Sequence, residues 1–280
     1  MDSFVQYFES IPSSHRSMIL FGGLTFFMLL ETGLPFFRFK YKRWKHFLLN
    51  LFFTFTTILV NFFLAVLLIK SSQWVTMNEF GLINLFSIPF ILQLIIGLML
   101  MDLISAWFAH WSVHQTKWLW QFHIIHHSDQ QVDATTANRH HPGESMIRFA
   151  FTLLAVFVIG APIWLVMVYQ ASSAFLSQFN HSNIKLPLWL DNALMLIICS
   201  PNMHRVHHHF RQPYSDKNFG NIFSIWDRLF GTFVKVDNNK LIYGLDTHME
   251  AAEAESVVNL LKIPFQRYRP EIEYKEKEVL

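Results

Sequence analysis

The chain of 280 residues is 52% hydrophobic and only 15% charged, whereas soluble domains carry about 25% charged residues, so an ordinary soluble protein is excluded. The formal net charge of +2 shows none of the basic excess of a nucleic-acid-binding protein. The single cysteine, Cys199, excludes an internal disulfide and a cysteine-based zinc or iron–sulfur site. We expect no cleavable signal peptide, because the first apolar run is long, begins near Ser17 and lacks an Ala-x-Ala exit.

Three apolar segments in the first 107 residues each approach the ~20 residues that a helix needs to cross a bilayer. They cover residues 17–37, 46–69 and 86–107. Five basic residues at 38–45 predict a cytoplasmic loop and an N-terminus on the outer side; a patch for anionic lipid or nucleic acid is the weaker interpretation. We expect residues 70–81 to form a short polar loop on the outer side. A carboxylate inside a span is a candidate functional residue, but Glu31 lies near the end of its segment, and we expect it to reach the lipid headgroups.

The third apolar segment leads into a polar and aromatic region, and its helix is expected to continue past His110. A further apolar stretch, 146–179, is interrupted by Gly160-Ala161-Pro162, and a Gly-Pro break of this kind indicates a turn. We predict a hairpin whose arms, 148–159 and 163–179, begin and end on the same side, which keeps His181 near the earlier histidines. Residues 189–200 are too short to span a membrane and predict an amphipathic interfacial helix.

These segments predict an all-α integral membrane protein with three to four transmembrane spans, a re-entrant or kinked hairpin and a cytoplasmic, helical, histidine-rich metal domain. The expected divisions are transmembrane helices at 1–107, a histidine-box core at 108–234 that includes the hairpin, and a soluble C-terminal tail at 235–280.

Twelve of the fifteen histidines lie between His110 and His209, and eight of them form three boxes. The boxes are His110-x-x-x-His114, His123-x-x-His126-His127 and His204-x-x-His207-His208. Residues three and four apart share one face of a helix, so each box presents its imidazoles together. Eight imidazoles exceed the four positions of a tetrahedral site, which indicates two ions. Imidazole suits zinc, copper, iron and nickel, so the metal stays open at this point.

Other classes of metal protein fit the pattern less well. A zinc hydrolase of the His-Glu-x-x-His type needs a glutamate in the box, whereas Trp111 follows His110. A transmembrane haem protein would need histidines at mid-span, and a metal transporter would need ligands within its spans. A membrane zinc hydrolase and a non-catalytic membrane metal-binding or metal-handling protein are therefore the alternatives.

Taken together, the motifs resemble those of the fatty acid hydroxylase/sterol desaturase superfamily of integral membrane di-iron oxygenases. The resemblance runs from about residue 102 to 232 and leans toward bacterial members related to alkylglycerol monooxygenase. Besides the boxes it includes Thr135-x-x-x-Arg139-x-His141-Pro142-x-Glu144, Asn180-His181-Ser182-Asn183, Asn218-Phe219-Gly220 and the WDRLFGT segment that ends at Thr232. The chain departs from it at Trp111, where many relatives have arginine.

The resemblance implies a set of metal ligands: His110, His114, His123, His126, His127, His204, His207 and His208, with His141 and His181 as further ligands or close neighbours. His140 and His209 are expected to support these residues, and His15, His46 and His248 lie outside every motif. Four carboxylates are candidates to hold the second nitrogen of a ligating imidazole: Asp129, Asp133, Glu144 and Asp227.

The implied activity is oxygen-dependent hydroxylation or desaturation of a lipid C–H bond, the lipid being a fatty acid, sterol, sphingoid base or ether lipid. The implied cofactors are two iron ions, with zinc as an alternative occupant of a purified sample, and O2 is the co-substrate. Because the sequence has no flavin, haem or iron–sulfur motif, we expect the electrons to come from a separate donor. This donor would be a reductase, a ferredoxin-like protein or a cytochrome b5-like protein. The expected location is a membrane, the inner one in a bacterium, with cytoplasmic boxes and no nucleic-acid partner.

Overall fold

The computed structural model describes residues 2–270, and within that range the chain forms helices joined by turns, as predicted. The helices are α1 (Asp2–Glu9), α2 (Ser13–Ser17), α3 (Gly23–Gly33), α4 (Arg43–Met77), α5 (Phe90–Asp102), α6 (Ala109–Gln115), α7 (Lys117–His127), α8 (Pro142–Ile159), α9 (Ile163–His181), α10 (Leu188–Leu194), α11 (Pro201–His207), α12 (Ile225–Leu229), α13 (Ala251–Ala254) and α14 (Val257–Lys262). Two π-helical segments, Met18–Gly22 and Leu103–Phe108, join α2 to α3 and α5 to α6.

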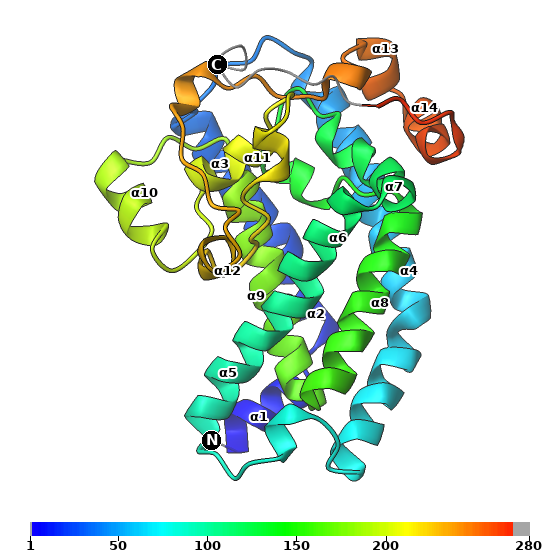
Figure 1. Ribbon diagram of the computed structural model, residues 1–280, viewed down its shortest axis with the longest axis vertical. Helices are drawn as coiled ribbons and strands as arrows, with labels where there is room; N and C mark the ends of the chain where they lie inside the picture. Colours follow the sequence, from blue (N-terminus) through cyan, green and yellow to red (C-terminus); the bar gives the residue numbers. More distant parts are fainter. Residues whose placement is uncertain (1, 271–280) are drawn as a thin grey trace.

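The long helices run side by side, and the shorter helices α7, α11, α13 and α14 gather at one end of them, away from the N-terminus (Figure 1). Three helical stretches are long and apolar enough to cross a membrane: Arg43–Asn84, Phe90–Gln115 and Pro142–Ile159, with mean hydropathies of 2.4, 2.0 and 1.5. The segment predicted as the first span is also helical, through α2 and α3, but it is not among these three. The protein is therefore an all-helical membrane protein.

The prediction of a polar outer loop at residues 70–81 was wrong for residues 70–77, because α4 continues to Met77. Ser72 is buried, and its hydroxyl donates a hydrogen bond to the carbonyl oxygen of Ala161 at 2.9 Å. Val75, one turn further, lies in the core against the α8–α9 hairpin. Ser72, which was predicted to lie in a solvated loop, is thus packed against the turn between α8 and α9.

The predicted hairpin is confirmed by α8 and α9, which are joined at Gly160, Ala161 and Pro162. Gly160 ends α8 in the left-handed conformation, with φ of 78°, and its amide donates to the carbonyl of Val156 at 2.9 Å. Proline at 162 cannot continue a helix from the preceding turn but starts the next one well. The returning helix ends at His181, next to the boxes.

We expect Gly160→Ala to destabilise the fold by more than about 1 kcal/mol, because a side chain at positive φ is strained. A Cβ there would also stand 2.1 Å from the carbonyl oxygen of Phe80. Thermal unfolding of the detergent-purified protein measures the effect. Gly33→Ala is the matched control, since a Cβ at Gly33 meets nothing within 4 Å. Equal unfolding temperatures for the two variants would contradict this account of the turn.

Glu31 does not reach lipid headgroups, contrary to expectation. Its side chain is buried, and Oε1 accepts hydrogen bonds from the backbone amides of Ala134 and Asn183, both at 2.8 Å. These two amides lie in separate segments of the histidine-rich region, one after the second box and one just after His181, so one carboxylate ties the end of α3 to both. Arg43 lies 3.6 Å away and offsets part of the charge.

The segments after the hairpin are shorter or better packed than the sequence suggested. The interfacial helix predicted at 189–200 is α10, which ends at Leu194 and gives way to a turn. Beyond residue 235, Leu245, Leu260 and Ile263 pack with α4 and α7 in one apolar cluster. The final part of the expected C-terminal tail, residues 271–280, lies outside the described residues.

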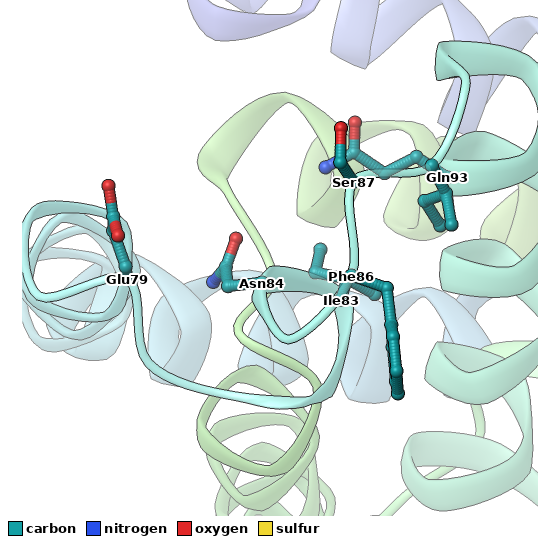
Figure 2. A pocket seen from close by; sticks show the side chains of 7 residues that line it. Glu79, Ile83, Asn84, Phe86, Ser87 and Gln93 are labelled. Atoms are coloured by element: carbon teal, nitrogen blue, oxygen red, sulfur yellow. The ribbon is translucent and has the colours of Figure 1, made fainter.

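A pocket of about 310 Å³ lies between α4 and α5, at the end of the molecule away from the boxes (Figure 2). Its lining includes Glu79, Asn84 and Gln93. The length of the spans separates this pocket from the histidines, so we assign it no part in the metal chemistry.

Candidate metal centre

The histidines are delivered to one place by the ends of four helices. α5 continues through the π-helical segment into α6, which carries His110 and His114, as predicted. α7 carries the second box at its C-terminal end, α9 ends at His181, and α11 carries His204 and His207. Because these helix ends converge at the same end of the bundle (Figure 1), residues more than 90 positions apart in the sequence become neighbours.

Nine of the ten predicted ligands fall into two groups in which the candidate ligand atoms all lie within 4.8 Å of one another. The five-histidine group consists of His110, His114, His123, His127 and His207, and the four-histidine group of His126, His181, His204 and His208. The groups adjoin, since the ring centroids of His127 and His208 are 5.0 Å apart and those of His204 and His207 are 5.1 Å apart. The arrangement therefore offers two candidate metal sites, one in each group.

The spacing of the imidazole nitrogens fits shared ions. The Nε2 atoms of His110 and His123 are 3.1 Å apart, and Nε2 of His181 lies 3.1 Å from that of His126 and 3.0 Å from that of His204. Two nitrogens bound to one ion at about 2.0–2.1 Å stand about 3.0–3.4 Å apart. Each pair therefore already has the separation of two ligands on one metal.

Several buried imidazole nitrogens also have no hydrogen-bond partner among the described residues. These include Nε2 of His114, His127, His207 and His208. A buried polar atom left unsatisfied costs about 1–3 kcal/mol, so such a cluster needs a partner that accepts lone pairs. A metal ion meets that need, and the residues present fit one in each group.

Backbone carbonyl oxygens orient three of these rings. Nδ1 of His110 donates to the carbonyl of Phe219 at 2.9 Å, Nδ1 of His207 to that of Lys217 at 2.8 Å, and Nδ1 of His181 to that of Ser177 at 2.7 Å. A proton held on Nδ1 leaves the lone pair on Nε2, where a metal would bind.

Two carboxylates orient further rings of the five-histidine group by accepting the Nδ1 proton. Oε1 of Glu144 accepts from Nδ1 of His123 at 2.8 Å, which confirms one predicted partner. Oδ1 of Asp216 accepts from Nδ1 of His114 at 2.8 Å, and this residue was missed by the sequence reasoning. Asp216 belongs to no box, and only the fold brings its segment beside α6.

The other three carboxylate candidates have different partners. Asp129 binds His46, with Nε2 2.9 Å from both carboxylate oxygens. Asp133 caps the following 3-10 turn and also approaches His46. Asp227 accepts from the backbone amides of Phe219 and Gly220, both at 2.8 Å. Asp227 therefore acts on the backbone that orients His110. His46, which lies outside every motif, is a buried partner of two aspartates.

His141 is the one predicted ligand that the structure leaves outside both groups. Its Nδ1 accepts from the amide of Gly143 at 2.9 Å and so caps α8. His140 stacks on His126 with ring centroids 4.9 Å apart, and Nδ1 of His209 accepts from the amide of Ile242 at 3.2 Å. All three are placed as supports of the surrounding structure.

Burial keeps the imidazoles neutral and ready to bind. Desolvation, and then the neighbouring imidazoles, lower the pKa of His123 and of His127 well below the ordinary value. Desolvation and His114 lower the pKa of His207 in the same way. A neutral ring offers a lone pair near pH 7 without first losing a proton, as metal binding requires.

We expect Asp216→Ala to weaken metal binding by the five-histidine group by about 10–100-fold, because removal of the partner of a ligating imidazole typically has that effect. Competition with a chelator, followed by elemental analysis, measures the affinity. The ion in the four-histidine group should be unaffected. Asp237→Ala is the matched control, since Asp237 is an exposed aspartate that caps a separate turn. Equal affinities in the two variants would contradict the role of Asp216.

Comparison with known proteins agrees with this geometry. Residues 94–232 match the family model for fatty acid hydroxylase. The chain is 29% identical over 145 residues to an ornithine lipid hydroxylase of Rhizobium tropici, which covers 52% of this chain and 43% of that protein. It is 34% identical over 155 residues to the alkylglycerol monooxygenase of Danio rerio, covering 52% of this chain and 31% of that protein. No solved structure matches the chain significantly.

The chain thus spans less than half the length of these relatives. The human alkylglycerol monooxygenase is 32% identical over 150 residues, and the match covers 51% of this chain and 30% of that protein. The family match begins within α5 and ends just after α12, so it contains both histidine groups together with Glu144 and Asp216. Residues 94–232 therefore form a fatty acid hydroxylase domain of the fatty acid hydroxylase/sterol desaturase superfamily.

Proposed function

We propose that the protein is an oxygen-dependent lipid hydroxylase of the membrane that binds two iron ions, one in each histidine group. The observation that carries this proposal is the pair of adjoining groups of buried imidazoles, set in a domain whose relatives are named lipid hydroxylases and monooxygenases. When bound, the iron ions would supply the activation of dioxygen and the attack on an unactivated C–H bond.

The chain's own part in this chemistry is to hold and orient. Glu144 and Asp216 hold the Nδ1 protons of His123 and His114, which leaves the Nε2 lone pairs of these rings available to bind an ion. The carbonyl of Phe219 does so for His110. Because the rings come from separate helices that are packed together, their positions are fixed before a metal arrives, and burial keeps the site dry.

The relatives' names favour a lipid with a polar head and an alkyl chain. One relative is named for ornithine lipid and others for alkylglycerol, and all are named for hydroxylation or oxygen insertion. We infer that this chain hydroxylates a C–H bond of a membrane lipid of that broad type. The apolar side chains that α4 exposes along its length, such as Phe62 and Phe63, support this inference, because membrane lipid would lie against them.

The membrane face and the electron supply follow from charge and composition. The basic segment at 38–45 precedes α4 at the end that carries the histidines, and basic loops stay on the cytoplasmic side. We therefore infer cytoplasmic boxes, facing the inside of the inner membrane in a bacterial cell. Electrons would come from a separate reductase, ferredoxin-like protein or cytochrome b5-like protein, because the sequence carries no flavin, haem or iron–sulfur motif.

Lipid analysis of cells with and without the gene tests this function, together with elemental analysis of the purified protein. The expected result is a lipid found only with the gene, one oxygen atom heavier than a lipid that is depleted, and two irons per chain. Zinc at both positions in iron-replete cells, with an unchanged lipid profile, would instead favour a metal-handling protein. Lipid cleavage without oxygen would favour a hydrolase.

A further inference from the structure

An apolar surface extends over α10, the turn that follows it, and α12. We call residues 188–197 and 225–230 the α10–α12 lobe. Its outward side chains are Leu188, Trp189, Leu196, Ile197, Ile225, Leu229 and Phe230, which are 44–72% exposed. Contiguous apolar surface of this kind marks a place that contacts another molecule or a membrane.

The two parts of the lobe are bonded into one unit. The amide of Ser224 donates to the carbonyl of Ile197 at 3.1 Å, and its hydroxyl donates to the carbonyl of Met195 at 2.7 Å. Arg228 also donates to the carbonyl of Met195, at 2.8 Å. Arg228 is exposed, but its guanidinium group is bonded to the lobe's own backbone, and the exposed side chains around it are mainly leucine, isoleucine and aromatic residues.

The lobe is fastened to a membrane-spanning stretch by two reciprocal tryptophan–aspartate pairs. Nε1 of Trp226 donates to Asp102 at 3.0 Å, and Nε1 of Trp107 donates to Asp227 at 3.0 Å. Phe230 stacks on Trp107 with ring centroids 4.4 Å apart. Both Asp102 and Trp107 lie within the span Phe90–Gln115, so α12 sits against the side of that span.

The position of these pairs along the span gives the depth of the lobe. A helix rises 1.5 Å per residue, so Asp102 lies roughly 18 Å from the start of the span at Phe90. The hydrocarbon core of a bilayer is about 30 Å thick, which places the attachment inside the core. Figure 1 agrees, with α12 beside the junction of α5 and α6 and not at the end occupied by α13 and α14.

From this attachment and this surface, we propose that lipid acyl chains cover the α10–α12 lobe, in the leaflet next to the histidine boxes. Amphipathic elements lie in a leaflet with leucine and tryptophan inward and lysine at the border. Lys235, which donates to Asn192 on α10 at 2.7 Å, lies at that border. The prediction of an interfacial helix near α10 thus extends to α12 and to a depth below the headgroups.

The immersion also sets the depth of the metal centre. The carbonyl of Phe219, which orients His110, belongs to the segment that the lobe's Asp227 holds through the Phe219 and Gly220 amides. The lobe and the five-histidine group are therefore joined by consecutive hydrogen bonds. A lobe held in the leaflet keeps the histidines at the border between headgroups and acyl chains.

Single cysteines report what covers the lobe in the full chain reconstituted into phosphatidylcholine vesicles. Leu229→Cys and Leu196→Cys probe the lobe, Phe62→Cys on α4 is the lipid-facing control, and Asn239→Cys is the control for the water-exposed end. The native Cys199 is buried and the unsubstituted chain gives its background. Each cysteine is tested with a charged maleimide and then, after attachment of an environment-sensitive dye, with acyl-chain-brominated lipid and aqueous iodide.

Positions 229 and 196 should behave like position 62, with labelling by the charged maleimide at least about tenfold slower than at position 239 and quenching by brominated lipid. Labelling and iodide quenching equal to those at position 239 would overturn the proposal, because water would then cover the lobe. Protection from maleimide without quenching by brominated lipid would overturn it too, since a protein surface would then cover the lobe. Both leucines are mostly exposed, so their replacement removes little packing, and size-exclusion chromatography checks folding.

Discussion

Under the proposed function, His207→Asn is expected to lose one of the two proposed metal ions and the lipid turnover. Nδ1 of His207 donates to the carbonyl of Lys217, while Nε2 is buried among the other members of the five-histidine group. Asparagine can place an N–H where Nδ1 lies but has no atom at the position of Nε2. The loss of metal affinity should exceed the roughly 10–100-fold loss that follows from removing a ligand's hydrogen-bond partner. Elemental analysis and lipid product formation measure it.

His209→Asn is the matched control for this substitution. His209 is two positions away and buried, but its Nδ1 accepts from the amide of Ile242 outside both metal groups. An asparagine carbonyl can accept the same bond, so this variant should retain two ions and full turnover. A folded His207→Asn protein that kept both ions and its activity would contradict the assignment of the five-histidine group.

Arg139→Met should destabilise the fold by about 3–5 kcal/mol, the usual cost of removing one partner from a buried charged network. Arg139 is 1% exposed and donates to the carbonyls of Ile125 on α7 and Ala254 on α13, at 2.9 and 2.7 Å. Its guanidinium also lies 3.9 Å from the Asp129 carboxylate. Methionine keeps much of the volume, but it removes the side-chain donor to the Ala254 carbonyl and one of two side-chain donors to the Ile125 carbonyl, and it takes the cation away from Asp129. Thermal unfolding in detergent measures the change.

Arg269→Met provides the comparison within the same chain. Arg269 binds Glu253 at the surface, and an exposed pair of this kind contributes about 0–1 kcal/mol. Its unfolding temperature should therefore stay close to that of the unsubstituted protein. If both arginine variants unfolded at the same temperature, the buried network around α7 would not hold the second histidine box in place.

The sequence predicted the features that depend only on residues close together in the chain: the histidine boxes, the hairpin turn and most of the spans. Imidazoles three and four residues apart share a helix face wherever the helix lies, so the boxes predicted their own grouping. Gly160 and Pro162 predicted the hairpin because each residue fixes its own backbone conformation. The apolar runs at 46–69 and 86–107 predicted two of the candidate spans for the same reason, whereas the run at 17–37 is not among them. A hydrophobicity pattern could not show that α4 continues through Ser72, whose hydroxyl finds its partner at Ala161.

The missed residues depend on contacts between distant segments. Glu31 has the composition of a span-end carboxylate, and only the fold brings the amides of Ala134 and Asn183 to it. His46 lies in no motif and meets Asp129 across 83 positions. Asp216 reaches His114 because the segment after α11 turns back toward α6. His141 shows the reverse case. A family motif surrounds it and led to its prediction as a ligand, yet it lies outside both groups and its Nδ1 accepts from the amide of Gly143, two residues away.

The origin of the oxygen atom in the lipid product tests the central claim most directly. Cells that express the protein are grown under heavy-isotope oxygen gas, and the lipid found only with the gene is examined by mass spectrometry, with the His207→Asn variant as the reference. A membrane lipid hydroxylase predicts one heavy oxygen atom per product molecule and no product from the variant. A product whose new oxygen carried no label, or the same product from the folded variant, would contradict it.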